Sequence, residues 1–348
     1  MLDFSQCKLE KIVVHFVGNK HREESTQLSK SETPINDELN EHLTKYFISH
    51  IKPDASYYFD TAPESGINQA FNCVQTIFGD YTQLVPQSVE LAKHLYECSV
   101  HPKIRSGEFF AVLIRDCVVD DELVDAIGLF KSEVKENFLK VLPSNGTYTI
   151  ISDSGININK LDKGCLIFNT EAQTGYRILI VDNINKAVEA EFWRDMFLQI
   201  MPRNDQFYQT QNFLNLCKGY VEDVYNEENN VSKPQQIEML NKTVNFFKEN
   251  DQFKLDEFEQ DVMMGESNSI QAFNEYKKFY EEQNDVKLND EFDISEDAVK
   301  NGKRKFKSVL KLDRNFHVYI HGDRENIERG FDSERKLNYY KLYFEEEV

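Results

Sequence analysis

The stretch Glu108-Phe-Phe-Ala-Val-Leu-Ile-Arg-Asp116 decides the fold, because it opens a run of segments rich in aromatic and branched residues. The others are Val124-Asp-Ala-Ile-Gly-Leu-Phe-Lys131, Asn137-Phe-Leu-Lys-Val-Leu142, Thr147-Tyr-Thr-Ile-Ile151, Gly164-Cys-Leu-Ile-Phe168 and Tyr176-Arg-Ile-Leu-Ile-Val181. Short polar connectors such as Asp120-Asp121-Glu122 and Ser144-Asn145-Gly146 join the early ones. Parallel strands need long crossover connections, and these connectors cannot hold them. The middle of the chain is therefore predicted to be an antiparallel meander.

Helical patterns flank this meander on both sides. A strand over Leu9–Val17 is followed by expected helices that begin at Asn36-Asp37, after Ser65-Gly66 and at Val85. From Ala187 the apolar period becomes helical, and Pro234 suits the first turn of one helix. Strands near 306–312, 316–320 and 339–344 are expected at the end, with a short polar helix between the Gly322-Asp323 turn and the last strand.

These patterns predict an α+β fold. It consists of an antiparallel β-meander with N-terminal helices, followed by a helical region and a small C-terminal β segment. The change of period near Asn183–Ala187 predicts two domains, with a mixed α/β domain at residues 1–185. A mainly helical domain with C-terminal strands is expected at residues 186–348. At 348 residues, the chain is long enough for two domains.

The charge is strongly acidic and unevenly distributed. The formal net charge is −20, and residues 221–300 hold 21 acidic against 8 basic side chains. Residues 301–348 hold 9 acidic and 11 basic side chains, so this end alone is slightly positive. An acidic surface also keeps a protein soluble, which is the plainer explanation of the excess. Polyanions can bind such a chain only where positive charge is locally concentrated.

The cysteines and the apolar segments point to a cytoplasmic protein. The six cysteines have neither CxxC nor metal-type spacing, which favours buried, reduced thiols. No apolar stretch approaches the roughly 20 residues that span a bilayer, and the first residues do not resemble a secretory signal. No membrane contact and no cofactor are expected.

A basic cluster near the C-terminus is the candidate nucleic-acid site. Its members, with two arginines further on, are Lys303, Arg304, Lys305, Lys307, Lys311, Arg314 and Arg324. Apolar residues are interleaved with the lysines, as in a strand or helix edge that follows a phosphate backbone. The alternative is that the cluster balances the charge of the acidic segment 290–297 just before it.

Two other constellations could carry metal chemistry. His317 and His321 lie four apart in an alternating strand, with Asp323 close by, but that spacing separates them by roughly 13 Å. The run Asp120-Asp121-Glu122, followed by Asp125 and Lys131, resembles the motif of metal-dependent nucleases, although the second acid of that motif is missing two positions before Lys131. Hairpin-turn residues are the plainer interpretation of Asp120 and Asp121. Aromatic pairs in the helical region are expected to be core.

Three segments carry a family resemblance, namely residues 105–114, 124–133 and 306–321. Here the chain resembles the bacterial nucleoid-associated protein (NdpA-type) family, over most of its length. The resemblance implies a mixed α/β, nucleoid-located protein of the cytoplasm that self-associates as a homodimer or larger. It supplies no catalytic residues. The net charge of −20 departs from that of a non-specific DNA coat. The alternative that the chain acts through a protein partner therefore stays open.

Three hypotheses follow from these observations. The first is a non-enzymatic nucleoid-associated protein that binds DNA non-specifically through the basic cluster. The second is an acidic interaction or DNA-mimic module that acts on a protein of DNA metabolism. The third is a metal-dependent nuclease that uses some of Asp116, Asp120, Asp121, His317 and His321.

Overall fold

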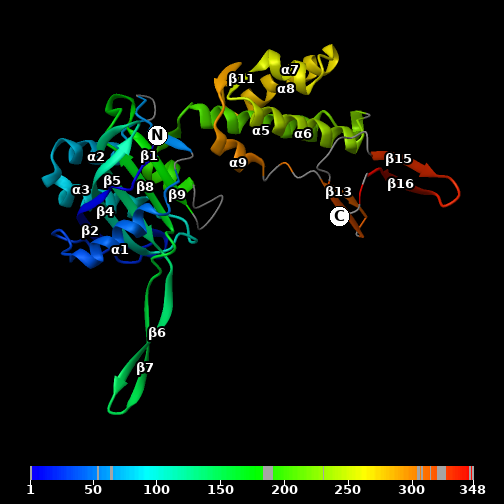
Figure 1. The fold of residues 1–348 in the computed structure, drawn as a ribbon. Coiled ribbons are helices and arrows are strands. Elements are labelled where there is room, and N and C mark those ends of the chain that lie inside the picture. Colours follow the sequence, from blue (N-terminus) through cyan, green and yellow to red (C-terminus); the bar gives the residue numbers. More distant parts are fainter. Residues whose placement is uncertain are drawn as a thin grey trace. The chain divides into compact units, whose positions relative to one another are not determined.

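The chain forms two compact units, Met1–Arg203 and Asn204–Val348 (Figure 1). The computed structural model describes residues 2–52, 55–62, 66–182, 191–229, 231–303, 306, 309–313, 315–319, 327–344 and 346. The predicted domain boundary near Asn183–Ala187 lies outside these residues. A π-helical segment, Glu191–Leu198, and strand β10 (Ile200–Pro202) belong to the first unit. The predicted α+β class is confirmed.

The first unit is built on an eight-stranded antiparallel sheet. Its centre is the meander β4 (Gly107–Val119), β5 (Glu122–Ser132), β8 (Lys163–Phe168) and β9 (Arg177–Asp182). Strands β1 (Leu2–Asp3) and β2 (Lys8–Val17) both pair with β4, and β3 (Ser56–Phe59) joins β9 to β10. Every neighbouring pair is antiparallel, as the short connectors predict.

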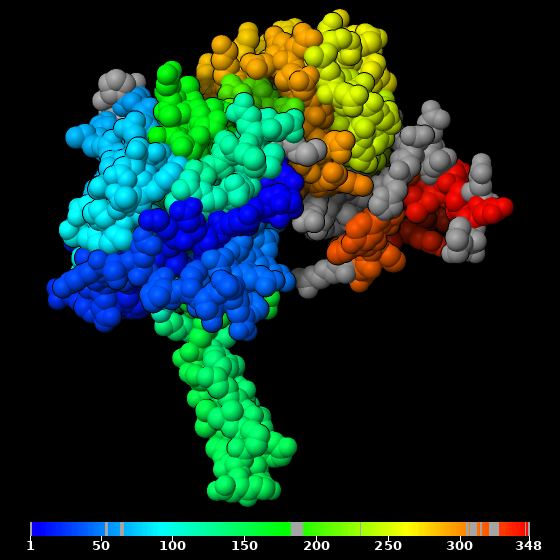
Figure 2. Space-filling view, turned by 60° about the vertical axis from the view of Figure 1, so that its left-hand side comes forward, coloured from blue at the N-terminus to red at the C-terminus, as the bar shows by residue number. Residues whose placement is uncertain are grey.

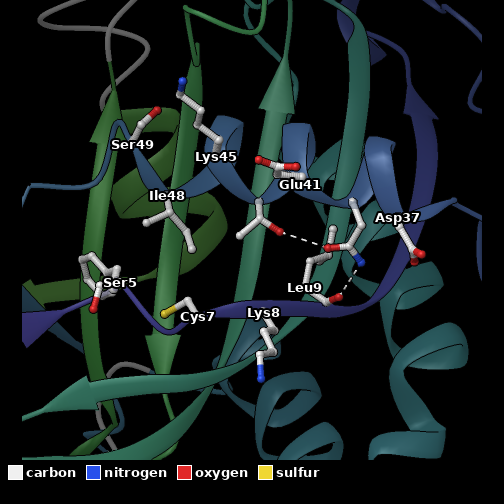
Figure 3. Close-up of a pocket in the computed structure, with 12 residues that line it drawn as sticks. Ser5, Cys7, Lys8, Leu9, Asp37, Glu41, Lys45, Ile48 and Ser49 are labelled. Atoms are coloured by element: carbon white, nitrogen blue, oxygen red, sulfur yellow. Dashed lines mark hydrogen bonds between the residues drawn. The ribbon is translucent and has the colours of Figure 1, made fainter.

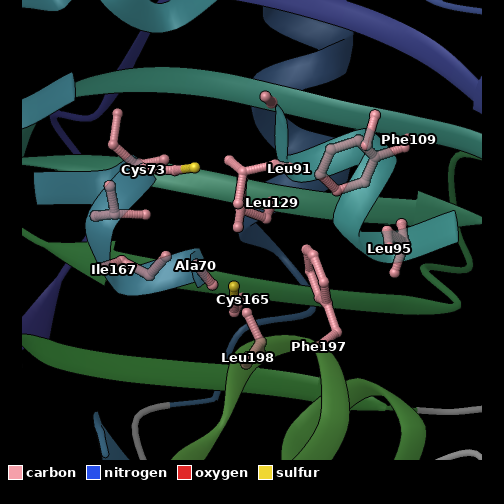
Figure 4. Close-up of a cluster of buried hydrophobic side chains, with 14 of the residues drawn as sticks. Ala70, Cys73, Leu91, Leu95, Phe109, Leu129, Cys165, Ile167, Phe197 and Leu198 are labelled. Atoms are coloured by element: carbon pink, nitrogen blue, oxygen red, sulfur yellow. The ribbon is translucent and has the colours of Figure 1, made fainter. Parts of the chain in front are cut away.

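Helices cover both faces of this sheet, which explains the unbroken apolar run of β4. Successive side chains of a strand point to opposite faces. Phe109 and Leu113 pack with α2 (Gln69–Gly79) and α3 (Leu84–Cys98), as Figure 4 shows for part of that cluster. Phe110 and Ile114 pack on the other face, where α1 (Asp37–Ile48) supplies Phe47. A strand buried on both sides needs an apolar residue at nearly every position.

Strands β6 (Lys135–Ser144) and β7 (Thr147–Ile156) leave the sheet and pair only with each other within the described structure. The sequence places them in the meander, but their polar residues alternate with the apolar ones. Such strands cannot be buried on both faces. They form a hairpin closed by Asn145 and Gly146, whose φ angles of 45° and 82° fit a tight two-residue turn. Figure 1 shows this hairpin projecting from the body of its unit.

The second unit is mainly helical. It contains α5 (Gln206–Asp223), α6 (Lys233–Glu249), α7 (Leu255–Val262), α8 (Ser267–Asn284) and α9 (Glu296–Lys303), with β11 (Gln252–Lys254) paired to β12 (Glu291–Asp293). The helices enclose an aromatic core centred on Phe213, whose ring lies 4.1 Å from that of Phe253. Ser232 and Gln235 form a capping box, and Pro234 occupies the first turn of α6, as predicted.

Two hairpins end the second unit. β13 (Val309–Leu312) pairs with β14 (Phe316–Tyr319), and β15 (Ile327–Asp332) pairs with β16 (Leu337–Leu342). The short helix predicted before the last strand is wrong for residues 327–332. Gly330 lies opposite Tyr339, and the tyrosine ring occupies the space above the glycine. This cross-strand packing stabilises a strand where the local sequence is polar.

None of the helices in the described part combines the length and apolar character needed to cross a bilayer.

Candidate nucleic-acid interface

The structure describes only part of the predicted basic cluster. Lys303 is the last residue of α9 and is exposed. Lys311 lies in β13, where its backbone pairs in register with His317 of β14. The other five predicted residues, Arg304, Lys305, Lys307, Arg314 and Arg324, lie outside the described residues. The DNA-contact role of the whole cluster therefore stays a prediction.

Lys303 has a second lysine beside it, Lys248 in the last turn of α6. Both side chains are exposed, and helices α6 and α9 are in contact. The pKa of Lys248 lies below its usual value, because of partial desolvation and then because of the nearby positive charge of Lys303. The sequence hypothesis did not include Lys248, because 54 positions separate it from Lys303. Helix packing alone brings the two lysines together.

Three of the five carboxylates in the segment 290–297, which was expected to neutralise the cluster, have other partners. Asp290 accepts a hydrogen bond from Lys277 at 2.5 Å. Glu296 and Asp297 lie 3.3 Å and 3.5 Å from the ammonium of Lys300, one turn before Lys303. Within the described residues, neither Lys248 nor Lys303 forms an ion pair with a carboxylate. Positive charge is thus concentrated where α6 and α9 end.

The last two hairpins are held against α6 by a small apolar cluster. Ile237 of α6 is buried, and four partly buried side chains pack on it: Leu312, Val318, Ile327 and Tyr340. Arg329 also lies 3.3 Å from Glu227. These contacts hold β13, the strand that contains Lys311, in the unit that also contains Lys248 and Lys303.

The hairpins also expose aromatic rings that the sequence analysis did not single out as functional. Phe316, Tyr319, Phe331 and Phe344 are each between 60% and 71% exposed. The pair Phe246 and Phe247 is buried, as expected for helical aromatics, whereas the same expectation is wrong for Phe279, which is 53% exposed. Exposed rings next to cations can stack on unpaired bases. The alternating pattern of the final strands could have predicted these exposed rings, because every second residue of a strand points to the same face.

The nuclease candidates belong to different units, and one of them lies outside the described residues. Asp120 and Asp121 form the turn between β4 and β5 with φ angles of 49° and 67°, which confirms the hairpin-turn interpretation. Asp120 accepts a hydrogen bond from Arg177 at 2.7 Å, and Asp116 lies 3.8 Å from Lys8. His317 is in the second unit, and His321 lies outside the described residues. Among the described side chains, no group of three or more metal-ligating residues comes together.

The first unit carries an open groove of about 640 Å³ between α1 and the start of β2 (Figure 3). Asn40 spans it, donating a hydrogen bond to the Leu9 carbonyl at 2.8 Å and accepting one from Thr44 at 3.2 Å. Its charged lining is balanced, with two lysines against Asp37 and Glu41. This balance makes it a poor polyanion site, and no nucleophile–base pair is evident among its lining residues.

The comparisons with known proteins agree with the resemblance seen in the sequence. A family model described as nucleoid-associated protein YejK matches residues 13–338. The match covers nearly the whole of both units and defines the chain as a nucleoid-associated protein of bacterial type. The chain belongs to the YejK family. A search of curated proteins gave no match.

Proposed function

We propose that this protein binds duplex DNA non-specifically, through phosphate contacts from its C-terminal cations and without catalysis. The contacting residues are Lys303, Arg304, Lys305, Lys307, Lys311, Arg314 and Arg324, to which the structure adds Lys248. Phosphate contacts fix a protein on the duplex but carry no base information. A nucleoid protein with this mechanism would bind widely along the chromosome.

The observation that carries this proposal is the Lys248–Lys303 pair. The positive charge of Lys303 contributes to the lowered pKa of Lys248, so the two ammonium groups repel each other, and a phosphate oxygen beside them relieves that repulsion. Three of the five acidic residues in the segment 290–297, namely Asp290, Glu296 and Asp297, already pair with other lysines. Membership of a nucleoid-associated family supports DNA as the polyanion.

A salt series tests the proposal. Binding of a fluorescent duplex should weaken steeply as salt rises, because each phosphate contact contributes about 0.9 to the slope of log K against log salt. Replacing Lys303, Arg304, Lys305 and Lys307 by Glu removes four such contacts, so it should lower that slope by about 3.6 and abolish binding at physiological salt.

The matched control changes four other lysines of the same unit to Glu. These are Lys218, Lys242, Lys254 and Lys278, three of which already pair with nearby glutamates. Both variants have the same net charge, so a general loss of attraction would affect them equally. Equal affinity of the two variants would contradict a localised site.

A second candidate function rests on the acidic half of the same unit. Residues 221–300 carry a large excess of carboxylates, and several, including Asp256, Glu257, Asp261 and Glu266, are exposed. Such a surface could bind a basic protein of DNA metabolism or imitate DNA towards it. Co-purification of a partner that persists after nuclease treatment would support this function, while capture only through DNA would contradict it.

We also propose that the protein self-associates, as the resemblance implies.

A further inference from the structure

Two cysteines of the first unit, Cys7 and Cys117, lie next to each other although 110 positions separate them along the chain. Their sulfur atoms are 3.2 Å apart, which is a hydrogen-bonding distance for sulfur, and both thiols are free. Among the described side chains, no third metal ligand joins them, so the pair lacks the ligand set of a structural metal centre. The sulfur atoms of a disulfide are about 2.05 Å apart, so a small movement would allow this pair to bond.

A bulge in β4 brings Cys117 to the same face of the sheet as Cys7. Ile114 faces the core that α1 covers, so strict alternation would turn Cys117, three positions further on, to the opposite face. The pairing of β4 with β5 shifts register between these two residues, and Asp116 has a φ of 60°, which is costly outside glycine. After the shift, Cys117 belongs to the same core as Ile114, and Cys7 packs against that core. β-Bulges re-aim side chains in this way.

The N-terminal segment is fixed on both sides of Cys7. β1 pairs with β4 at residues 118–119, and the pairing of β2 with β4 begins at Arg115. The segment between β1 and β2 therefore passes residues 116–117, and the Cys7 N–H donates a hydrogen bond to the Phe4 carbonyl at 3.2 Å. In Figure 2 the N-terminal segment, in dark blue, lies at the surface of its unit. The two pairings hold the Cys7 thiol beside the bulge.

The two thiols differ in their access to solvent. Of the six cysteines, all of which are within the described residues, Cys7 alone is not buried, whereas Cys117 is completely buried. Cys7 lines the open groove of about 640 Å³ between α1 and the start of β2, and Figure 3 shows its sulfur there. A dissolved oxidant therefore reaches Cys7 first.

Hydrogen bonding also favours the reactive form of Cys7. The pKa of its thiol lies below the usual value, chiefly because of the hydrogen bond with Cys117, which outweighs burial and the charges of Asp3 and Asp116. Burial alone has the opposite effect and raises the pKa of Cys73 to about 11. Because the thiolate is the nucleophile, Cys7 differs from the buried cysteines in ionisation as well as in access.

We infer that Cys7 and Cys117 form a two-thiol redox site whose substrate is a hydroperoxide. The Cys7 thiolate attacks one peroxide oxygen, the O–O bond breaks, and the second oxygen leaves as hydroxide or an alkoxide. Cys7 is thereby oxidised to a sulfenic acid. The Cys117 sulfur then attacks the Cys7 sulfur, an S–S bond forms, and the sulfenic hydroxyl leaves as water with the proton of the Cys117 thiol.

These steps balance without any other oxidant. The two thiols lose two electrons and two protons, and the hydroperoxide is reduced to water and an alcohol, or to two waters in the case of hydrogen peroxide. A dithiol reductant returns the pair to thiols by exchange. The disulfide connects the N-terminal segment covalently to β4, so one wall of the groove depends on the redox state. The inference does not depend on DNA binding.

Oxidation of the reduced full chain by hydrogen peroxide tests this inference without a variant. Loss of the Cys7 thiol should be at least about threefold faster than loss of the thiol of N-acetylcysteine at the same pH, because more of it is thiolate. Peptide mapping should show a bond between Cys7 and Cys117, and dithiothreitol should restore both thiols. A Cys7 thiol that reacts no faster than the free thiol, or that bonds to another cysteine, would overturn the inference.

Matched variants assign the two roles. Cys117→Ala removes the second attack, so sulfenic acid should accumulate at Cys7, where dimedone captures it, and should form more slowly because the hydrogen bond is lost. Cys7→Ala should abolish both the capture and the disulfide. The control is Cys73→Ala, which removes a buried thiol of the same unit and should leave the disulfide and its rate unchanged. Capture at a different cysteine in Cys117→Ala, or undiminished peroxide consumption by Cys7→Ala, would contradict the assigned roles.

Discussion

The ammonium of Lys131 lies 2.8 Å from the carboxylate of Glu133, and both side chains are completely buried. Lys131 also pairs in register with Lys163 on the neighbouring strand, so two cations lie opposite each other with one carboxylate between them. Like charges opposite each other in a sheet are destabilising. Glu133 therefore compensates the charge of both lysines at the point where the hairpin of β6 and β7 leaves the sheet.

Removal of this carboxylate should destabilise the first unit strongly. Glu133→Ala leaves two buried lysines without their shared partner, which costs about 3–5 kcal/mol in comparable buried pairs. Urea denaturation followed by fluorescence of Trp193, a buried reporter in the same unit, measures the change. Glu136→Ala, which removes an exposed ion pair with Lys160, is the control and should change stability little. If both variants changed the free energy of unfolding by a similarly small amount, the buried carboxylate of Glu133 would not stabilise the first unit as predicted.

Stability should fall as the pH drops, partly because of His15. Burial lowers its pKa to about 4, below the usual 6.5. Its Nδ1 accepts a hydrogen bond from the Ser29 N–H at 3.1 Å, and its Nε2 lies 2.9 Å from Ser88 Oγ, so the neutral ring is the form that fits. The unfolded chain takes up a proton below about pH 6.5, whereas the folded chain does so only near pH 4.

The contribution of His15 to the free energy of unfolding is therefore fully present above pH 6.5. It is lost progressively as the pH falls towards 4, and the loss reaches roughly 3 kcal/mol. Denaturation of wild type and of His15→Gln at several pH values in this window measures it. The variant should show the shallower pH dependence. Substitution of exposed His42 is the control, and equal curves for wild type and His15→Gln would contradict the prediction.

Lys248 should contribute one phosphate contact to DNA binding, although the sequence did not single it out. Lys248→Ala is expected to lower the salt slope by about 0.9 and to weaken binding at low salt. Lys242→Ala provides the comparison, because that lysine lies on the same helix and pairs with Glu238 at 3.2 Å. If the two variants bind alike, Lys248 is not part of the interface.

Two thiols in the first unit should form a disulfide when an oxidant is supplied. The sulfur atoms of Cys7 and Cys117 lie 3.2 Å apart, and hydrogen bonding with Cys117 lowers the pKa of Cys7. With hydrogen peroxide, the pair loses two electrons and two protons, and the peroxide is reduced to water. Peptide mapping should find Cys7 linked to Cys117 while fully buried Cys165 stays reduced. Oxidation of Cys165 ahead of this pair would contradict the prediction.

Local patterns predicted most of the fold. The apolar segments from Glu108 to Val181 and their short connectors indicate antiparallel pairing, because chain geometry allows no other connection over so few residues. The caps at Asn36 and Ser232 lie where the sequence indicates helix starts. The strand at Ile327–Asp332 was missed, since it depends on the packing of Tyr339 over Gly330 and not on local propensity.

The candidate site divides in the same way. Sequence alone located the basic cluster at Lys303–Lys311, because charge along the chain is visible without a fold. It could not associate Lys248 with Lys303, or show that Asp290 pairs with Lys277, since both facts depend on tertiary packing.

The sequence by itself determined which segments form helices, strands and turns, through the apolar period, the turn residues and the charge. Tertiary structure decided which segments are buried. The strands at 135–156 have the composition of sheet strands, yet they form an exposed arm. Helices cover both faces of β4, which is apolar at nearly every position, whereas the strands at 135–156 alternate polar and apolar residues and lie outside the two cores. Burial depends on contacts between distant residues, which local patterns do not contain.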